Sequence, residues 1–121
     1  MVKILLVEDN EINRDMLTRR LDRQGFSVCC AVDGASGVAM ASSEMPDLIL
    51  MDVVMPGQNG FQLTRAINRT PEFADVPIII CTSKNLETDR VWGMRQGAKD
   101  SVMKPVSADE LLSKINTLAE A

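Results

Sequence analysis

Five side chains that could take part in metal or phosphoryl chemistry come directly after short apolar runs of the sequence. They are two adjacent acids, a third acid, a hydroxyl and an ammonium: Glu8, Asp9, Asp52, Thr82 and Lys104. Carboxylate oxygens suit Mg²⁺, which proteins usually hold with one or two carboxylates and a phosphate. An aspartate can also act as a nucleophile and form an aspartyl phosphate. The set predicts a magnesium-dependent phosphoryl-transfer site in which Lys104 and Thr82 neutralise and position the transferred group.

Each of these residues also has an ordinary explanation. Asp52 ends an apolar run and precedes a loop rich in Pro, Gly and Asn, so it could simply terminate a strand. Asp9 or Asn10 could cap the helix that follows, although capping accounts for one of the paired acids and not for both. The occurrence of all five residues at successive strand ends favours a shared site.

Strand and helix signals alternate along the whole chain. Apolar runs predict strands over residues 2–7 and 26–32, in the run that ends at Asp52, and over 76–81 and 100–103. Apolar residues at helical spacing predict helices over 11–24, 35–43, 61–69 and 86–96 and from Ser107 onward. This alternation predicts one α/β domain over residues 1–121, a three-layer, doubly wound parallel sheet with helices on both faces. The carboxyl ends of its strands lie at one edge, where the five side chains should meet.

Helical spacing also predicts which residues face the core. On the inner faces of the first three helices we expect Ile12, Met16, Leu17, Leu21, Val38, Ala39 or Ala41, Phe61, Leu63 or Thr64, and Ile67. Gly25 and Gly97 should end the first and fourth helices. Ser107 and Glu110 have the spacing of a capping box.

Composition narrows the class of protein. The 121-residue chain has a net charge of −4, which argues against DNA or an anionic membrane as a direct partner. It shows neither a signal peptide nor an apolar run long enough to span a bilayer, so we expect a cytoplasmic protein. It has no histidine, so a phosphohistidine donor would belong to a partner. Cys29, Cys30 and Cys81 lack the spacing of a metal site or a disulfide framework, and neighbours in a strand point to opposite faces, so we expect reduced thiols.

The chain resembles the receiver domain of two-component response regulators in its single-domain, CheY-like form. The resemblance is carried by Val-Glu-Asp-Asn at 7–10, Met-Asp-Val-Val-Met-Pro-Gly at 51–57, Asn-Gly at 59–60, Thr82, Gly-Ala at 97–98 and Lys104-Pro105. It implies a flavodoxin-like fold with five parallel strands in the order 2-1-3-4-5. Residues 82–98 are also similar to regulators of type IV pilus twitching motility and phototaxis, which implies a role in motility or taxis signalling.

The resemblance also implies roles for individual residues. Asp52 would accept a phosphoryl group from a histidine kinase or phosphotransfer protein, and Asp9 and Asp52 would ligate Mg²⁺. Glu8 would act through water, and Val54 would contribute its backbone carbonyl. Lys104 would pair with the phosphoryl group, and Thr82 would move toward it to signal the state.

Further implications concern activity and partners. The chain would catalyse only its own phosphorylation and dephosphorylation, so we expect no enzyme activity on other substrates. An output protein would bind the face made by the fourth helix, the last strand and the last helix, and the chain would be a monomer or a weak dimer. The Lys104–Pro105 peptide is often cis in this family. We expect Lys104→Ala to leave the fold intact and to damage signalling.

The sequence departs from the family pattern at Ser101, where an aromatic ring usually reports the movement of the threonine. This departure motivates an alternative, a phosphorylation-independent interaction module with a degenerate switch. A metal-dependent phosphohydrolase is disfavoured, because such enzymes generally have a second acid where Val54 stands. Trp92 could pack on the fourth helix or anchor a partner. We expect Val54 and Lys84 to tune dephosphorylation.

Overall fold

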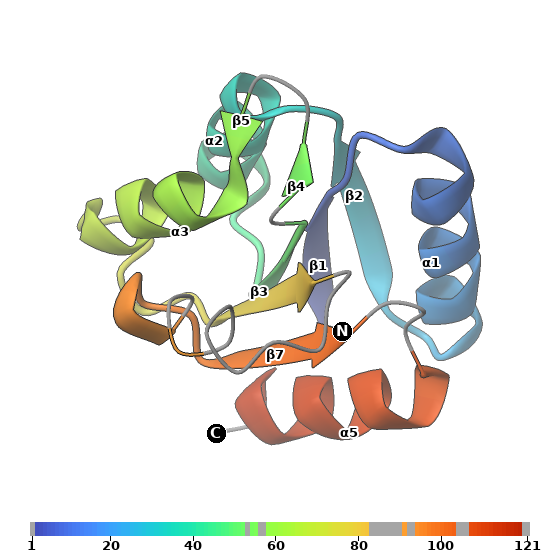
Figure 1. The fold of residues 1–121 in the computed structure, drawn as a ribbon. Coiled ribbons are helices and arrows are strands. Elements are labelled where there is room, and N and C mark those ends of the chain that lie inside the picture. The colour runs from blue at the N-terminus through green and yellow to red at the C-terminus, as the bar shows by residue number, and fades with distance from the viewer. Residues whose placement is uncertain are drawn as a thin grey trace.

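A parallel sheet of five strands forms the centre of the molecule (Figure 1). The computed structural model describes residues 2–52, 54–55, 58–82, 91, 94–103 and 107–119. The strands are β1 (Lys3–Val7), β2 (Ser27–Ala31), β3 (Leu48–Asp52), β6 (Ile78–Thr82) and β7 (Asp100–Met103). Their order is β2-β1-β3-β6-β7, and every pairing in this sheet is parallel. The predicted order 2-1-3-4-5 is therefore confirmed.

Helices cover both faces of the sheet, as the alternating pattern predicted. They are α1 (Glu11–Arg23), α2 (Gly34–Glu44), α3 (Gly60–Arg69) and α5 (Ala108–Ala119). In Figure 1, α1 and α5 lie on one side of the sheet, and α2 and α3 lie on the other. Most of the predicted helix over 86–96 lies outside the described residues. Of the residues in this range that the structure describes, 91 and 94–95 are helical. In the part of the chain that the structure describes, no helix is both long and apolar enough to cross a membrane.

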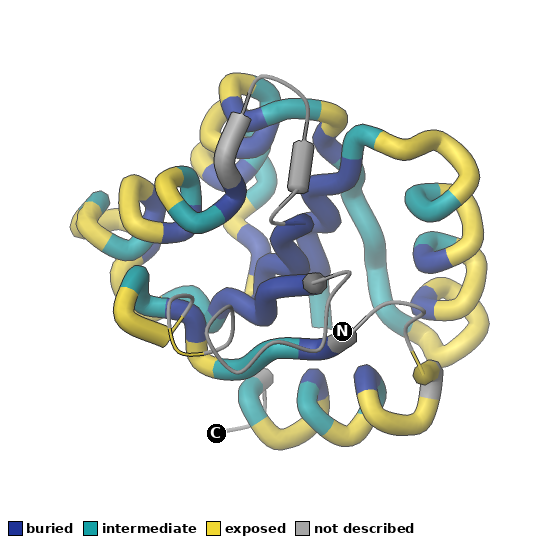
Figure 2. The backbone as a smooth tube through the Cα atoms, in the orientation of Figure 1, coloured by how far each residue is buried: buried dark blue, intermediate teal, exposed yellow. Residues whose placement is uncertain are grey.

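The central strand β3 is buried along its whole length. Ile49 and Met51 join the apolar cluster beneath α2 and α3, whereas Leu48 and Leu50 join the cluster beneath α1 and α5. This alternation follows from the period of two in a strand, which sends successive side chains to opposite faces. Figure 2 shows the same arrangement, with buried residues along the central strands and exposed residues on the outer surfaces of the helices. The predicted strand buried on both faces is confirmed.

Side-chain caps fix where α1 and α2 begin. Asn10 Oδ1 accepts a hydrogen bond from the backbone N–H of Asn13 at 3.0 Å, so Asn10 is the residue that caps α1. Asp33 caps α2 in the same way through Ser36 N at 2.7 Å, and this hydrogen bond lowers the pKa of Asp33. Because Asn10 does the capping, Asp9 is available for another role.

Two predicted inward-facing positions on α1 are wrong. Ile12 is 76% exposed and Met16 is 41% exposed, whereas Leu17 and Leu21 are buried. Consecutive residues of a helix lie about 100° apart around its axis, so the 12/16 and 17/21 pairs form two different stripes. One of the two stripes faces the sheet, and it is the leucine stripe.

On α2 one predicted inward-facing position is wrong, whereas the inward-facing positions predicted on α3 are supported. Val38 is exposed and Ala39 is also exposed, while Ala41 is buried on the inner face with Gly37. In α3 the buried inner residues include Thr64 and Ile67, with Phe61 and Leu63 packed more loosely against the same cluster.

The segment after β3 contains a small antiparallel ladder where we expected a loop. Strands β4 (Val54–Met55) and β5 (Gln58–Asn59) pair with Val54 opposite Asn59 and Met55 opposite Gln58. Residues 56–57, which connect them, lie outside the described residues. Two-residue strands carry too little periodic pattern to be recognised in a sequence.

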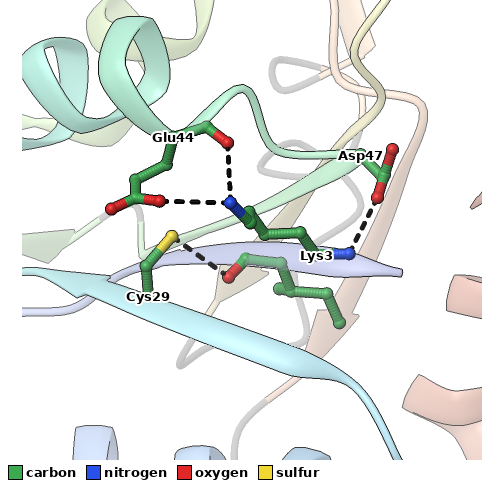
Figure 3. Close-up of polar contacts among 5 residues, drawn as sticks. Lys3, Cys29, Glu44 and Asp47 are labelled. Atoms are coloured by element: carbon green, nitrogen blue, oxygen red, sulfur yellow. Dashed lines mark hydrogen bonds and ion pairs between the residues drawn. The ribbon is translucent and has the colours of Figure 1, made fainter. Parts of the chain in front are cut away.

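The cysteines are thiols, as predicted. Cys29 packs against the α2/α3 side and Cys30 against the α1/α5 side, and neither they nor Cys81 form a disulfide. Cys29 Sγ donates to Ile4 O at 3.6 Å. Cys29 lies close to Lys3, whose Nζ contacts Glu44 Oε2 at 3.1 Å (Figure 3). Burial and the nearby Glu44 carboxylate raise the pKa of Cys29, so its thiol stays protonated.

Gly97 provides a stability prediction. Its φ of +106° is in the region that favours glycine, and an added Cβ would lie 2.5 Å from Asn68 Cγ. We expect Gly97→Ala to lower the free energy of unfolding by about 2 kcal/mol, measured by urea denaturation. Gly25→Ala is the matched control, since Gly25 has a φ of +89° and open space around the added atom. An equal loss of unfolding free energy in both variants would show that the contact with Asn68 does not contribute to the destabilisation of Gly97→Ala.

Candidate functional site

Three acids meet at the carboxyl edge of the central strands. Glu8 and Asp9 follow β1 directly, and Asp52 is the last residue of β3. The two strands pair in parallel with Val7 opposite Met51, which brings the next residues along each strand to the same edge. Glu8, Asp9 and Asp52 each offer a carboxylate oxygen, and these oxygens lie within 4.8 Å of one another. The predicted convergence of the acids is confirmed.

Burial strengthens the repulsion between the charges of these three carboxylates. Glu8 is 1% exposed and Asp52 is 3% exposed, while Asp9 is intermediate. At an effective dielectric constant of about 20, two ionised carboxylates 4.8 Å apart repel by on the order of 3 kcal/mol. A divalent cation would replace this repulsion with attraction, and an all-oxygen donor set is the kind that Mg²⁺ prefers. The residues present therefore fit a magnesium site.

Hydrogen bonds hold the backbone of the acid pair in place. Glu8 N donates to Ala31 O of β2 at 3.0 Å, which extends the β1–β2 ladder by one step. Arg14 Nη1 donates to both Glu8 O at 3.1 Å and Asp9 O at 3.3 Å. The sequence pattern does not single out Arg14, because arginines on helix surfaces are most often solvated.

The other predicted site residues are only partly described. Asp52 pairs with Cys81 on β6, so Thr82 is one step further along at the same edge, opposite Met103 on β7. The side chain of Thr82 and the whole of Lys104, which follows Met103, lie outside the described residues. The backbone of Val54 belongs to β4, two positions after Asp52. Lys84, Trp92 and the Lys104–Pro105 peptide also lie outside the described residues.

Lys114 joins Ser101 to α5. Its Nζ donates to Ser101 O at 2.5 Å and lies 3.2 Å from Asp100 Oδ1 and 3.1 Å from Glu110 Oε1. Partial burial lowers the pKa of Lys114, but the hydrogen bonds to Glu110 and Asp100 outweigh burial and raise it. The lysine therefore stays charged at neutral pH and ties β7 to α5. The sequence pattern does not predict this contact.

A comparison with known protein families identifies the family of this chain. The profile of the response regulator receiver domain matches residues 4–116. The chain belongs to this family. The receiver domain is 48% identical over 118 residues to Protein PilH from Pseudomonas aeruginosa PAO1, and the match covers 98% of each protein.

Solved structures support the same assignment. The chemotaxis protein CheY4 of Vibrio cholerae superimposes on this receiver domain with a TM-score of 0.92 and 29% identity, covering 98% of each chain. The receiver domain of the sensor histidine kinase PA1611 from P. aeruginosa PAO1 superimposes with a TM-score of 0.90 and 32% identity, covering 99% of this chain and 98% of its own. That structure has a magnesium ion coordinated in its active-site cleft. The flavodoxin-like, CheY-like fold expected from the sequence is confirmed.

Proposed function

We propose that this receiver domain accepts a phosphoryl group from a partner's phosphohistidine onto Asp52 in a Mg²⁺-dependent reaction and thereby changes its binding to an output protein. The observation that carries the proposal is the cluster of Glu8, Asp9 and Asp52 oxygens within 4.8 Å at one sheet edge. The Mg²⁺ coordinated in the related PA1611 receiver domain supports the choice of metal. The chain would act as a switch and would have no other substrate.

Each site residue of this chain would have a separate role in the reaction. A carboxylate oxygen of Asp52 attacks phosphorus, the phosphorus–nitrogen bond breaks, and the leaving imidazole of the partner keeps the bonding electrons and takes up a proton. Asp9 and Asp52 would hold Mg²⁺, with Glu8 acting through water and the Val54 carbonyl as a further ligand. When bound, the metal supplies neutralisation of charge on the phosphoryl oxygens. Lys104 would pair with the phosphoryl group, and Thr82 would move toward it.

A small phosphodonor tests this proposal without any partner. The protein is treated with acetyl phosphate and Mg²⁺ and its intact mass is measured. We expect one added phosphoryl group that EDTA prevents, that hydroxylamine removes and that Asp52→Asn abolishes. The proposal is wrong if no phosphoryl group is added, or if Asp52→Asn retains it.

The pathway and location are part of the proposal. The identity of 48% to Protein PilH, together with the resemblance of residues 82–98 to twitching-motility regulators, supports a role in motility signalling. The phosphodonor would be a histidine kinase or phosphotransfer protein in the cytoplasm. The output protein would bind the face that includes β7 and α5, and the receiver domain would be a monomer or a weak dimer.

Exposed residues on α1 provide a place for the phosphodonor protein. Ile12 and Met16 line a shallow hollow of about 420 Å³, together with Asp15, Arg19, Arg20 and Arg23. Helix α1 begins one residue after Asn10, so Ile12 is at the end of the hollow that follows the acid pair in the chain. An apolar pair beside arginines favours a partner helix that carries apolar and acidic side chains.

The α1 surface gives a prediction that separates docking from chemistry. We expect the double variant Ile12→Ser/Met16→Ser to slow phosphotransfer from the phosphodonor protein by at least about tenfold, because burying these side chains contributes to binding. Phosphorylation by acetyl phosphate should be unchanged. The matched control is Val38→Ser, an exposed apolar residue on α2, which should alter neither rate. An equal loss with both donors would place the effect on the fold or on the acid cluster.

One observation favours the alternative of a phosphorylation-independent interaction module. Ser101 replaces the usual aromatic ring, and its carbonyl is held by Lys114, which fixes β7 against α5. Binding of the output protein, measured with and without acetyl phosphate, separates the two functions. A difference in affinity supports the switch, and equal affinities support the constitutive module.

A further inference from the structure

We propose that Arg14 is a positioning residue for the acid cluster, which bends the backbone at Glu8 and Asp9 so that both carboxylates point to the same site before a cation binds. The inference rests on the proposed function, because it assigns a role within that cation site. It concerns a residue of α1 that reaches back past the helix start to the end of β1.

The geometry of the acid pair requires such a bend. In an extended strand, successive side chains point to opposite faces, so two adjacent acids could not both reach Asp52. Yet Glu8 and Asp9 both contribute oxygens within 4.8 Å of one another and of an Asp52 oxygen. The backbone must therefore leave the extended conformation directly after β1.

Arg14 holds the backbone in this bent form. Successive carbonyls of an extended strand also point in opposite directions, but Glu8 O and Asp9 O both accept from the single nitrogen Nη1 of Arg14, at 3.1 and 3.3 Å. Both carbonyls can reach one donor only where the chain has turned. A charged donor also makes these hydrogen bonds stronger than neutral ones.

The residues on either side of the bend are anchored separately. Glu8 N is fixed to Ala31 O at 3.0 Å, and Asn10 O accepts from the backbone N–H of Arg14 at 2.9 Å. These two contacts set the ends of the segment, and the guanidinium sets the carbonyls between them. Arg14 is half-buried, and its Nη1 contacts both of these carbonyls.

The charge of Arg14 and its hydrogen bonds act on cation binding in opposite directions. A positive charge near three carboxylates weakens the attraction for a second cation, so removing the charge alone would tighten Mg²⁺ binding. Removing the hydrogen bonds lets the acid pair relax toward an extended backbone, so the carboxylates must be gathered again when the metal binds. Residues that orient metal ligands in this way typically change affinity 10–100-fold when they are lost. The sign of the change therefore tells the two roles apart.

The test measures Mg²⁺ affinity of the unphosphorylated full chain by isothermal titration calorimetry. Arg14→Met keeps most of the length of the side chain but removes its charge and its donors, and we expect Mg²⁺ to bind about tenfold more weakly. Arg14→Lys keeps the charge and a single ammonium, so we expect a smaller loss. Arg69→Met, in the last turn of α3, removes the same charge far from the acid pair and should leave the affinity unchanged.

Hydrogen exchange of the Glu8 amide, which donates to Ala31 O at 3.0 Å, provides a second readout. We expect faster exchange at this amide in Arg14→Met, with unchanged exchange in the core strands. Unchanged or tighter Mg²⁺ binding in Arg14→Met overturns the proposal. If that variant does not fold, unchanged binding in Arg14→Lys overturns it instead. These measurements use unphosphorylated protein, so their outcome is distinguishable from a failure of the proposed function, which is tested by phosphoryl transfer to Asp52.

Discussion

Asp9→Asn is expected to raise the free energy of unfolding in metal-free buffer by about 1 kcal/mol and to weaken Mg²⁺ binding at least tenfold. Oxygens of Asp9, Glu8 and Asp52 lie within 4.8 Å of one another, so the charge of Asp9 repels the two buried carboxylates when no cation is present. Helix capping does not oppose the change, because Asn10 caps α1. The same carboxylate that destabilises the empty site is a predicted ligand of the metal.

Urea denaturation in EDTA and in excess Mg²⁺ measures both effects. A ligand that binds the folded state stabilises it according to its affinity, so Mg²⁺ should stabilise the wild type strongly and Asp9→Asn weakly. Asp75→Asn removes an exposed carboxylate from the loop after α3 and should change neither curve by more than about 0.5 kcal/mol. A lower free energy of unfolding for Asp9→Asn in EDTA would contradict the prediction, because it would show that the Asp9 carboxylate stabilises the folded state without a metal.

The sequence was sufficient to predict the sheet and the meeting of the acids. A short apolar run such as 48–51 predicts a buried strand. Because strands alternate with helices along the chain, the sheet is parallel and the carboxyl ends of all its strands lie at one edge. The position of Glu8, Asp9 and Asp52 follows from topology and needs no knowledge of side-chain contacts. For this reason it could be predicted and is confirmed.

Which side of a helix faces the sheet could not be decided in the same way. The pairs Ile12/Met16 and Leu17/Leu21 both have helical spacing, and each pair alone satisfies the pattern of a buried stripe. Which pair faces the sheet depends on how α1 packs against its neighbours, and the spacing of residues within the helix carries no information about that packing. The hollow that Ile12 lines was therefore unexpected.

Contacts of single long side chains were also beyond the sequence. Arg14 reaches carbonyl groups five and six residues earlier, and Lys114 reaches a strand thirteen residues earlier. Both arginine and lysine are most often solvated on helix surfaces, so their types give no signal. Their roles depend on a bend after β1 and on the crossing of β7 and α5, and both are tertiary features.

Leu50→Ala is expected to lower the free energy of unfolding by about 3 kcal/mol. Leu50 is fully buried in β3, where it packs between the strands and the inner residues of α1 and α5. Truncation removes buried apolar groups and leaves a cavity that a central strand, covered on both faces, cannot close, and such changes cost about 2–5 kcal/mol. A domain of this size has only about 5–15 kcal/mol of stability in total.

The midpoint and slope of a urea curve measure this loss, and Ile12→Ala serves as the control. The side chain of Ile12 has the same number of atoms as that of Leu50 but is 76% exposed, so its truncation should cost less than about 0.5 kcal/mol. Molecules of Leu50→Ala that remain folded should still bind Mg²⁺, because Asp52 is held by its pairing with Cys81 on β6 as well as by the core. If Mg²⁺ affinity fell in proportion to stability across Leu50→Ala and Gly97→Ala, the acid cluster would depend on the packing of the whole core. An unchanged affinity would show that the strand ends and the loop after β1 are enough to build it.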